Sequence, residues 1–150
     1  MKIAIQKLKT LRNKTAISIA LCKKALEETN NDLIKAEKIL TQWGAEKISD
    51  KQSRTTTQGG IFSYVHHNRK IAALVELLCE TDFVAANPDF QKLGTELAMQ
   101  VASLPAKDVK TLLIQEYIRD PSKKVGDLIK EAVLKFGENI KTGKFIRWSL

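Results

Sequence analysis

The chain has 150 residues, and its 25 Lys and Arg side chains outnumber its 17 Asp and Glu side chains, which gives a formal net charge of +8. This length fits one compact globular unit or two small ones and excludes a large multidomain enzyme. With 43% hydrophobic and 28% charged residues, the chain can bury a core, so the composition excludes an intrinsically disordered protein.

No signal for membrane insertion or secretion is evident in the sequence. No apolar run approaches the roughly 18 residues of a membrane span, and residues 1–10 alternate lysines with aliphatic residues instead of forming an apolar stretch. Cys22 and Cys79 lie far apart in apolar surroundings, which is typical of free thiols in a reducing compartment. We therefore expect a soluble cytoplasmic protein without disulfides.

Residues 1–45 are expected to form three short helices packed as a bundle of the ubiquitin-associated kind. Aliphatic residues recur at helical spacing in each of them. Ser18 is expected to cap the second helix, and Asn31 or Asp32 the third, which Gly44 would end in the left-handed conformation.

Residues 46–58 are polar and follow neither the helical nor the strand period, so they are predicted to form a linker. Beyond them, residues 61–66 and 70–78 are β-rich runs separated by Asn68-Arg69, a spacing that favours a hairpin. The second run is almost continuously apolar, which predicts a central strand.

The rest of the chain predicts helices and one closing strand. The fold class is therefore α+β, with residues 59–150 forming a core in which a small antiparallel three-stranded sheet is packed with helices on one face. The expected elements are a helix from Asn87-Pro88 to Leu104, a helix leading into a loop over residues 109–118, a helix from Asp120-Pro121-Ser122 to Gly137, and a strand over residues 145–148.

The segment Cys79–Ala85 is the candidate binding loop. It follows a buried strand, precedes a helix cap, and places Phe83 between Asp82 and Val84. Loops held between rigid elements carry binding residues in many proteins. The alternative is that Phe83 folds back into the core while Asp82 caps a turn.

Catalytic and metal sites are weakly indicated. Adjacent His66 and His67 on a strand point to opposite faces, so they cannot both bind one ion with Cys79, and no second Cys or His pair completes a site. A Cys79–His66 nucleophile or a Glu80–Asp82 acid/base pair would need a pocket and an orienting third group. We expect no enzyme activity, no metal and no cofactor.

The positive charge is concentrated near the N-terminus, because residues 1–54 hold 12 basic and 6 acidic side chains whereas residues 55–150 hold 13 and 11. Such a cluster could neutralise phosphates, so a basic RNA- or ribosome-binding module is the alternative function. Acidic residues are interspersed, however, and no aromatic residue is interleaved as a stacking platform. A solvated or protein-docking face is favoured, without a membrane or nucleic-acid partner.

Four stretches of the chain together resemble one protein family. The first is the run Val75–Ala85, with Tyr64-Val65-His66 before it. The others are Leu11-Arg12, Thr15 and Cys22–Leu26; Arg54 with Gly59; and Gly137-Glu138-Asn139-Ile140 followed by Phe145 and Arg147. In this order they resemble the motifs of elongation factor Ts, whose members exchange the nucleotide of elongation factor Tu.

This resemblance implies a translation factor that binds elongation factor Tu in its GDP-bound and nucleotide-free forms and promotes exchange of GDP for GTP. It implies that a loop of Thr81, Asp82, Phe83 and Val84 inserts beside the partner's magnesium and phosphate site. It also implies that the N-terminal bundle docks on the partner. Because the apolar faces of its helices are needed internally, Arg12, Lys23 and Lys24 should face outward, and we expect the bundle to dock through them. The Lys, Ile and Asn content suggests a bacterial or symbiont cytoplasm, with an organelle stroma or matrix as the alternative.

The chain departs from the family pattern in three ways. Ala16-Ile17-Ser18 stand where the family reads Gly-Ala-Gly, and Leu21 stands where it has an acid. The connection from Leu104 to Val109 is short, and the second of the two similar half-cores of longer members is absent, so residues 59–150 form a single half-core. The net charge is +8, whereas family members are typically acidic. The uncovered face of a single sheet predicts a homodimer; alternatively, residues 109–118 cover that face, or it stays bare until the partner binds.

Overall fold

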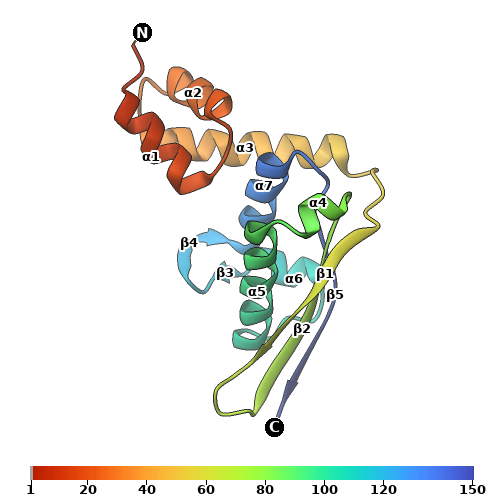
Figure 1. The fold of residues 1–150 in the computed structure, drawn as a ribbon. Helices are drawn as coiled ribbons and strands as arrows, with labels where there is room; N and C mark the ends of the chain where they lie inside the picture. Colours follow the sequence, from red (N-terminus) through yellow and green to blue (C-terminus); the bar gives the residue numbers. More distant parts are fainter. Residues whose placement is uncertain (1) are drawn as a thin grey trace. The chain divides into compact units, whose positions relative to one another are not determined.

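The computed structural model of the chain describes residues 2–150, apart from the side chain of Ile48. The first residue of the expected 1–45 bundle therefore lies outside the described residues. The chain folds into two units (Figure 1): the residues up to Gln52 with Lys130–Gly137 form one, and Ser53–Ile129 with Glu138–Leu150 form the other.

The first unit contains the expected helices α1 (Ile5–Thr15), α2 (Ile19–Glu28) and α3 (Leu33–Lys51). As predicted, Ser18 caps α2, and of the two candidates it is Asp32 that caps α3, because their side chains accept hydrogen bonds from backbone N–H groups of the first turn. The apolar faces of the helices meet in one buried cluster made of Leu11, Ile17, Cys22, Ala25, Leu26, Ala36, Leu40 and Leu134.

Helix α3 is longer than the sequence predicted. Gly44 does not end it, and the helix continues to Lys51. The reason for a glycine at this position is close packing, because a Cβ on Gly44 would lie 2.5 Å from the backbone oxygen of Lys130 in the same unit. The prediction failed because a glycine required by a close helix contact looks the same in sequence as a glycine that ends a helix.

Ala16 takes the left-handed conformation (φ 54°) at the end of α1, and its N–H donates to the carbonyl of Arg12 at 2.7 Å. This is one of the positions where the family resemblance leads one to expect glycine. The turn therefore keeps a glycine-like backbone although Ala16 carries a Cβ, which is disfavoured in this region.

The second unit is built on an antiparallel sheet of β1 (Gln58–Val65), β2 (Ile71–Cys79) and β5 (Lys141–Ser149), in the order β1-β2-β5. The hairpin and the central position of β2 are confirmed. Ser63, Leu74 and Ile146 stand opposite one another across the three strands. This α+β architecture is the fold class predicted from the sequence.

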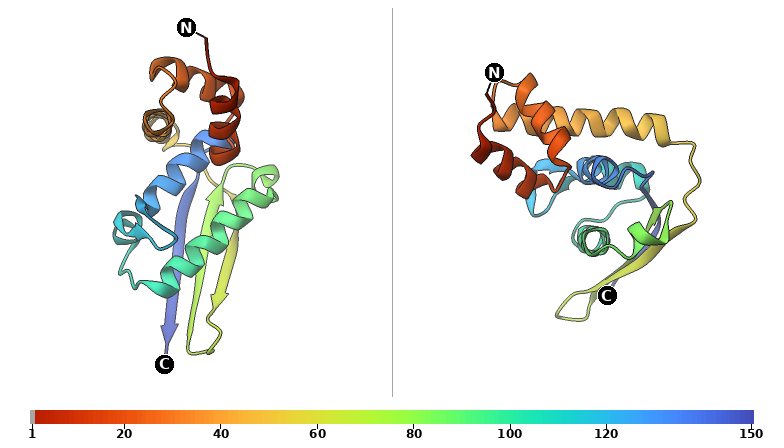
Figure 2. Two further views of the ribbon diagram at one scale, coloured as in Figure 1. Left: turned by 90° about the vertical axis from the view of Figure 1, so that its left-hand side faces the viewer. Right: turned by 45° about the horizontal axis from the view of Figure 1, so that its top comes forward.

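Helix α5 (Pro88–Ser103) covers one face of this sheet (Figure 2). Asn87 and Pro88 begin it as predicted, since the Asn87 side chain accepts a hydrogen bond from the N–H of Asp89. Alternate residues of β2 are buried against it, and the core between helix and sheet contains Ala73, Val75, Leu77, Cys79, Phe90, Leu97, Ala98 and Val101.

Residues 109–136 differ from the prediction. Helix α6 (Val109–Ile114) is followed by a short hairpin of β3 (Glu116–Tyr117) and β4 (Asp120–Lys124), and α7 (Val125–Phe136) begins only after it. Asp120-Pro121-Ser122 is thus a strand and not a helix start. The Asp120 carboxylate instead bonds to the N–H and hydroxyl of Ser122, a local pattern that competes with helix capping.

Gly94 allows α5 to approach the sheet closely, because a Cβ there would lie 2.2 to 2.4 Å from three ring atoms of Phe62 on β1. The Phe62 ring also packs edge-on against Phe90, with ring centroids 6.2 Å apart. The ring therefore packs against two successive turns of α5, at Phe90 and Gly94.

Gly94→Ala is expected to destabilise the protein, although alanine favours a helix by about 1 kcal/mol over glycine. Overpacking of a dense core costs about 1 to 3 kcal/mol and outweighs this gain. The free energy of unfolding should be measured in urea. Thr95→Ala, at the exposed neighbouring position, is the control; equal stability of Gly94→Ala and the unmodified chain would show that the ring can move aside.

Candidate functional site

The candidate site is the segment between the central strand β2 and α5. Glu80 and Thr81 leave the strand, and the residues expected to form a loop wind into the one-turn helix α4 (Asp82–Ala85). Thr81 caps this turn, because its Oγ1 accepts a hydrogen bond from the N–H of Val84 at 3.3 Å. The four residues proposed to act together thus lie at the N-terminus and in the first turn of one short helix.

Phe83 points away from the core. Its side chain is 86% exposed, Asp82 is also exposed, and Val84 is half-buried. The alternative prediction, in which Phe83 folds back into the core, is therefore wrong. An aromatic ring held outside on a short, capped turn is available for contact with another molecule.

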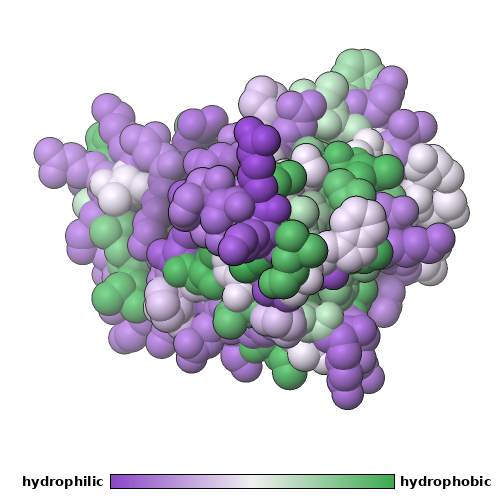
Figure 3. Space-filling model, turned by 90° about the horizontal axis from the view of Figure 1, so that it is seen from below, coloured by the Kyte–Doolittle hydropathy of each residue, from purple (hydrophilic) through white to green (hydrophobic). Residues whose placement is uncertain are grey.

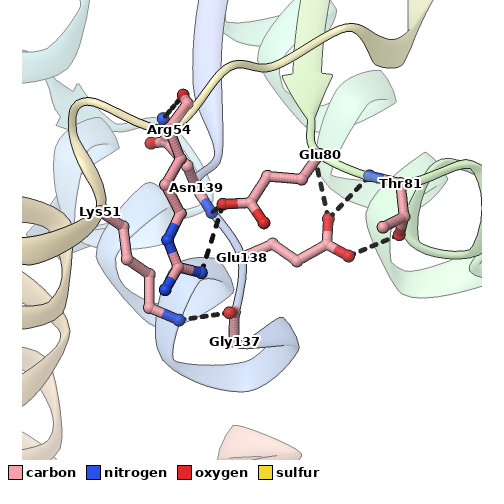
Figure 4. A network of polar contacts seen from close by, with 7 residues as sticks. All are labelled: Lys51, Arg54, Glu80, Thr81, Gly137, Glu138 and Asn139. Carbon is pink, nitrogen blue, oxygen red and sulfur yellow. Dashed lines mark hydrogen bonds and ion pairs between the residues drawn. The ribbon is translucent and has the colours of Figure 1, made fainter.

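One carboxylate holds the start of this turn, as Figure 4 shows. Glu138 lies between α7 and β5, and its Oε2 accepts hydrogen bonds from the N–H groups of Glu80 at 3.0 Å and Thr81 at 3.1 Å. Its Oε1 accepts the hydroxyl of Thr81. The Thr81 hydroxyl thus donates to Glu138 while its oxygen caps α4.

A second carboxylate, that of Glu80 in the segment itself, binds residues outside the segment. Glu80 accepts a hydrogen bond from the N–H of Asn139 at 3.0 Å, and it forms an ion pair with Arg54 at 3.6 Å. The side-chain amide of Asn139, which is buried, donates to the carbonyl of Arg54 at 2.8 Å. Residues 80–81 and 138–139 therefore bind each other reciprocally (Figure 4). In the first unit, the Lys51 ammonium donates to the carbonyl of Gly137.

Cys79 lies directly before this segment and is fully buried. Its Sγ donates to the carbonyl of Thr81 at 3.2 Å. Burial raises the pKa of the Cys79 thiol, and the nearby Glu138 carboxylate raises this pKa further. The thiol is therefore held neutral, which makes it a poor nucleophile and a structural group.

The other proposed partner contacts lie in the first unit. Arg12 is on α1, Lys23 and Lys24 are on α2, and all three side chains are exposed. Lys23 pairs with Glu27 at 3.9 Å and Lys24 with Glu28 at 4.0 Å, each one helical turn away. Exposed pairs of this kind are weak, so the lysines can exchange these partners for others.

The histidines considered for a metal site have other contacts. His66 Nδ1 lies 2.9 Å from the hydroxyl of Tyr64, and the rings of His66 and His67 lie 4.1 Å apart. Within residues 2–150, no group of three or more His, Cys, Asp or Glu residues is arranged to hold a metal ion. In the same range, no helix has both the length and the apolar character needed to cross a membrane.

Residue patterns near the loop did not identify the groups that hold it. Glu138 is 57 and 58 residues from the N–H groups that it binds. Asn139 is 59 residues from the Glu80 carboxylate and 85 residues from the Arg54 carbonyl that it binds. The available signal was the family resemblance, since Arg54 and the run Gly137–Ile140 belong to the stretches that carry it. The resemblance marked these residues without giving them a role.

Comparison with known proteins agrees with this resemblance. A family model described as elongation factor TS matches residues 80–150, which begin at Glu80 of the candidate site. Elongation factor Ts of Thermosipho melanesiensis is 36% identical over 193 residues, covering 99% of this chain and 98% of that protein.

Two further relatives show the same relation. Elongation factor Ts of Coprothermobacter proteolyticus is 35% identical over 195 residues, covering 100% of this chain and 99% of the relative. Elongation factor Ts of Thermotoga maritima is 36% identical over 193 residues, with 100% and 97% coverage. These alignments are longer than the 150-residue chain, so the relatives contain stretches that this chain lacks.

The chain has an α+β architecture, with a three-stranded antiparallel sheet covered on one face by a helix and a capped turn on which Phe83 is exposed. Identity of about a third along the whole chain defines its family. The chain belongs to the elongation factor Ts family of translation elongation factors.

Proposed function

We propose that this chain binds elongation factor Tu and promotes the release of GDP, so that GTP can replace it. The observation that carries the proposal is the outward position of Phe83 on α4, a turn fastened to the end of the central strand. Family membership supports the identity of the partner. The chain then acts by binding alone, with no catalysed covalent step and no cofactor of its own.

In this proposal, Thr81, Asp82, Phe83 and Val84 insert beside the magnesium and phosphate site of the partner. The Phe83 ring would enter an apolar pocket, and the exposed Asp82 carboxylate would face the surroundings of the bound ion. By linkage, if binding of the chain weakens GDP binding, GDP weakens binding of the chain by the same factor. The complex of all three is then transient, and either GDP or GTP resolves it.

Phe83→Ala is expected to weaken the complex with nucleotide-free elongation factor Tu on the order of 2 kcal/mol or more, because a buried aromatic anchor dominates many interfaces. GDP release should slow in parallel. Complex stability is measured by titration calorimetry and release with a fluorescent GDP.

The control for Phe83→Ala is Ile114→Ala, which truncates a side chain of α6 that is 67% exposed. It should leave both quantities unchanged. Because Phe83 is exposed, Phe83→Ala should also leave the free energy of unfolding unchanged. Equal effects of the two variants on the complex would exclude Phe83 as the inserted residue.

We further propose that the first unit docks on the partner through Arg12, Lys23 and Lys24. Its surface is mixed in sign, which favours a protein partner over a nucleic acid. Besides the pairs of Lys23 and Lys24, Lys14 pairs with Glu37 at 2.7 Å and Lys35 with Asp32 at 3.7 Å. Lys24 also lies 4.9 Å above the ring of Trp43.

Reversal of both lysines, Lys23→Glu with Lys24→Glu, is expected to slow association with elongation factor Tu and to reduce its dependence on salt. Charges at an interface rim mainly steer encounter, so dissociation should change less. Rates are measured by stopped-flow at several ionic strengths. Lys107→Glu with Lys110→Glu, two exposed lysines of the second unit, changes the net charge equally; an equal effect would show that net charge and not docking is responsible.

The outer face of the sheet is apolar, and we propose that it joins a second copy of the chain. Val65, Leu74 and Trp148 on this face are 60%, 43% and 68% exposed. Residues 109–118 do not cover these side chains. Figure 3 shows groups of green hydrophobic side chains reaching the surface between hydrophilic ones. Two such sheets could stack face to face about a two-fold axis and bury these apolar side chains.

Light scattering at micromolar concentration is expected to give a mass near twice the 16.8 kDa of one chain. Leu74→Glu should give the mass of one chain, because it places a charge in the centre of the face without disturbing the buried side of β2. A single-chain mass for the unmodified protein, unchanged on concentration, would exclude the dimer.

A further inference from the structure

The helical turn α4, which carries Phe83, is too short to be stable by itself. Helix α4 has four residues, and helices of this length are not stable in isolation because nucleation outweighs the few hydrogen bonds formed. Phe83 adds little packing because it is exposed. Packing of its half-buried side chains against β1 and β2 contributes to its position, and polar contacts at its first residues hold the point where it begins.

Those contacts converge on Glu138. One carboxylate accepts the N–H of Glu80, the N–H of Thr81 and the hydroxyl of Thr81. The same hydroxyl oxygen accepts the N–H of Val84. Hydrogen bonds in such a chain polarise one another, and bonds to a charged acceptor are the strong ones.

We propose that Glu138 is a positioning residue that orders residues 81–84 before elongation factor Tu is bound. This inference rests on the proposed function, and it assigns to Glu138 no contact with the partner. A turn ordered in advance binds with a smaller entropic cost. When only a fraction of the molecules has the competent turn, the apparent dissociation constant rises by the inverse of that fraction.

Three substitutions of Glu138 distinguish the effect of its side-chain length from the effect of its charge. Glu138→Ala removes all three acceptor bonds, and Glu138→Asp keeps the charge on a side chain shorter by one methylene. Glu138→Gln removes the charge but keeps the length: its oxygen can accept both N–H groups, and its amide can donate to the Thr81 oxygen. Glu116→Ala, which truncates an exposed glutamate of the same unit, is the matched control.

The first measurement is hydrogen exchange in the free protein. The N–H groups of Thr81 and Val84 should exchange about tenfold faster or more in Glu138→Ala, while those at the centre of β2 keep their protection. Glu138→Asp should show a smaller increase, and Glu138→Gln the smallest, because glutamine keeps the length of the side chain but replaces the charged acceptor with a neutral one. Unchanged exchange at Thr81 and Val84 in both Glu138→Ala and Glu138→Asp would overturn the proposal.

The second measurement is the chain concentration that gives half-maximal release of fluorescent GDP from elongation factor Tu. Glu138→Ala should raise this concentration about tenfold, with a smaller effect on the maximal rate. In Glu138→Gln this concentration should stay closer to that of the unmodified chain, and Glu116→Ala should leave it unchanged. A loss in Glu138→Gln equal to that in Glu138→Ala, with normal hydrogen exchange, would show that the charge acts on the partner directly and would overturn the positioning role.

Different results would contradict the proposed function and the positioning role of Glu138. If the unmodified chain does not accelerate GDP release, the proposed function is wrong and this role is wrong with it. If the unmodified chain accelerates release and Glu138→Ala does so equally well, only the positioning role is wrong.

Discussion

The hydrogen bonds accepted by the Glu138 carboxylate fix the point where the central strand passes into α4. They join two segments that are far apart in sequence, one leaving β2 and one entering β5. Since β2 is paired on both sides and packed under α5, its end is a firm support. Everything proposed for Phe83 depends on this support, because the four-residue turn contributes little stability of its own.

The site is held by hydrogen bonds from backbone N–H groups to carboxylates, and the apolar core begins at the buried Cys79. Cys79 closes the core beneath the segment, the Glu138 carboxylate binds the backbone of Glu80 and Thr81, and Phe83 is left exposed. The Glu80 carboxylate in turn accepts a hydrogen bond from the N–H of Asn139. An aromatic side chain exposed to this degree buries little apolar area when the free chain folds. In the proposed function, the Phe83 ring would become buried against elongation factor Tu and would contribute to binding there.

Much of the fold could be predicted because its signals are local. Ser18 and Asp32 act as caps as their positions suggest, Asn87-Pro88 begins α5, and the apolar run of β2 becomes the central strand. The end predicted for α3 at Gly44 was wrong because this glycine is required by close packing against the backbone of Lys130. The helix start predicted at Asp120-Pro121-Ser122 was wrong because the Asp120 carboxylate accepts a hydrogen bond from the N–H of Ser122. The place of Cys79–Ala85 in the chain marks it as a candidate loop, and the family resemblance narrows this loop to residues 81–84. Glu138 acts across many residues, and no local pattern reveals its contact.

In the proposed function, this chain opens the nucleotide site of elongation factor Tu with the α4 turn and the one three-stranded sheet that supports it. Release of a fluorescent GDP, followed by stopped-flow at increasing concentrations of the unmodified chain, tests it most directly. We expect the release rate to rise with concentration, to saturate well above the spontaneous rate, and the complex to dissociate when excess GDP is added. Release at the spontaneous rate at every concentration, in mixtures where the two proteins are shown to be bound, would contradict the account.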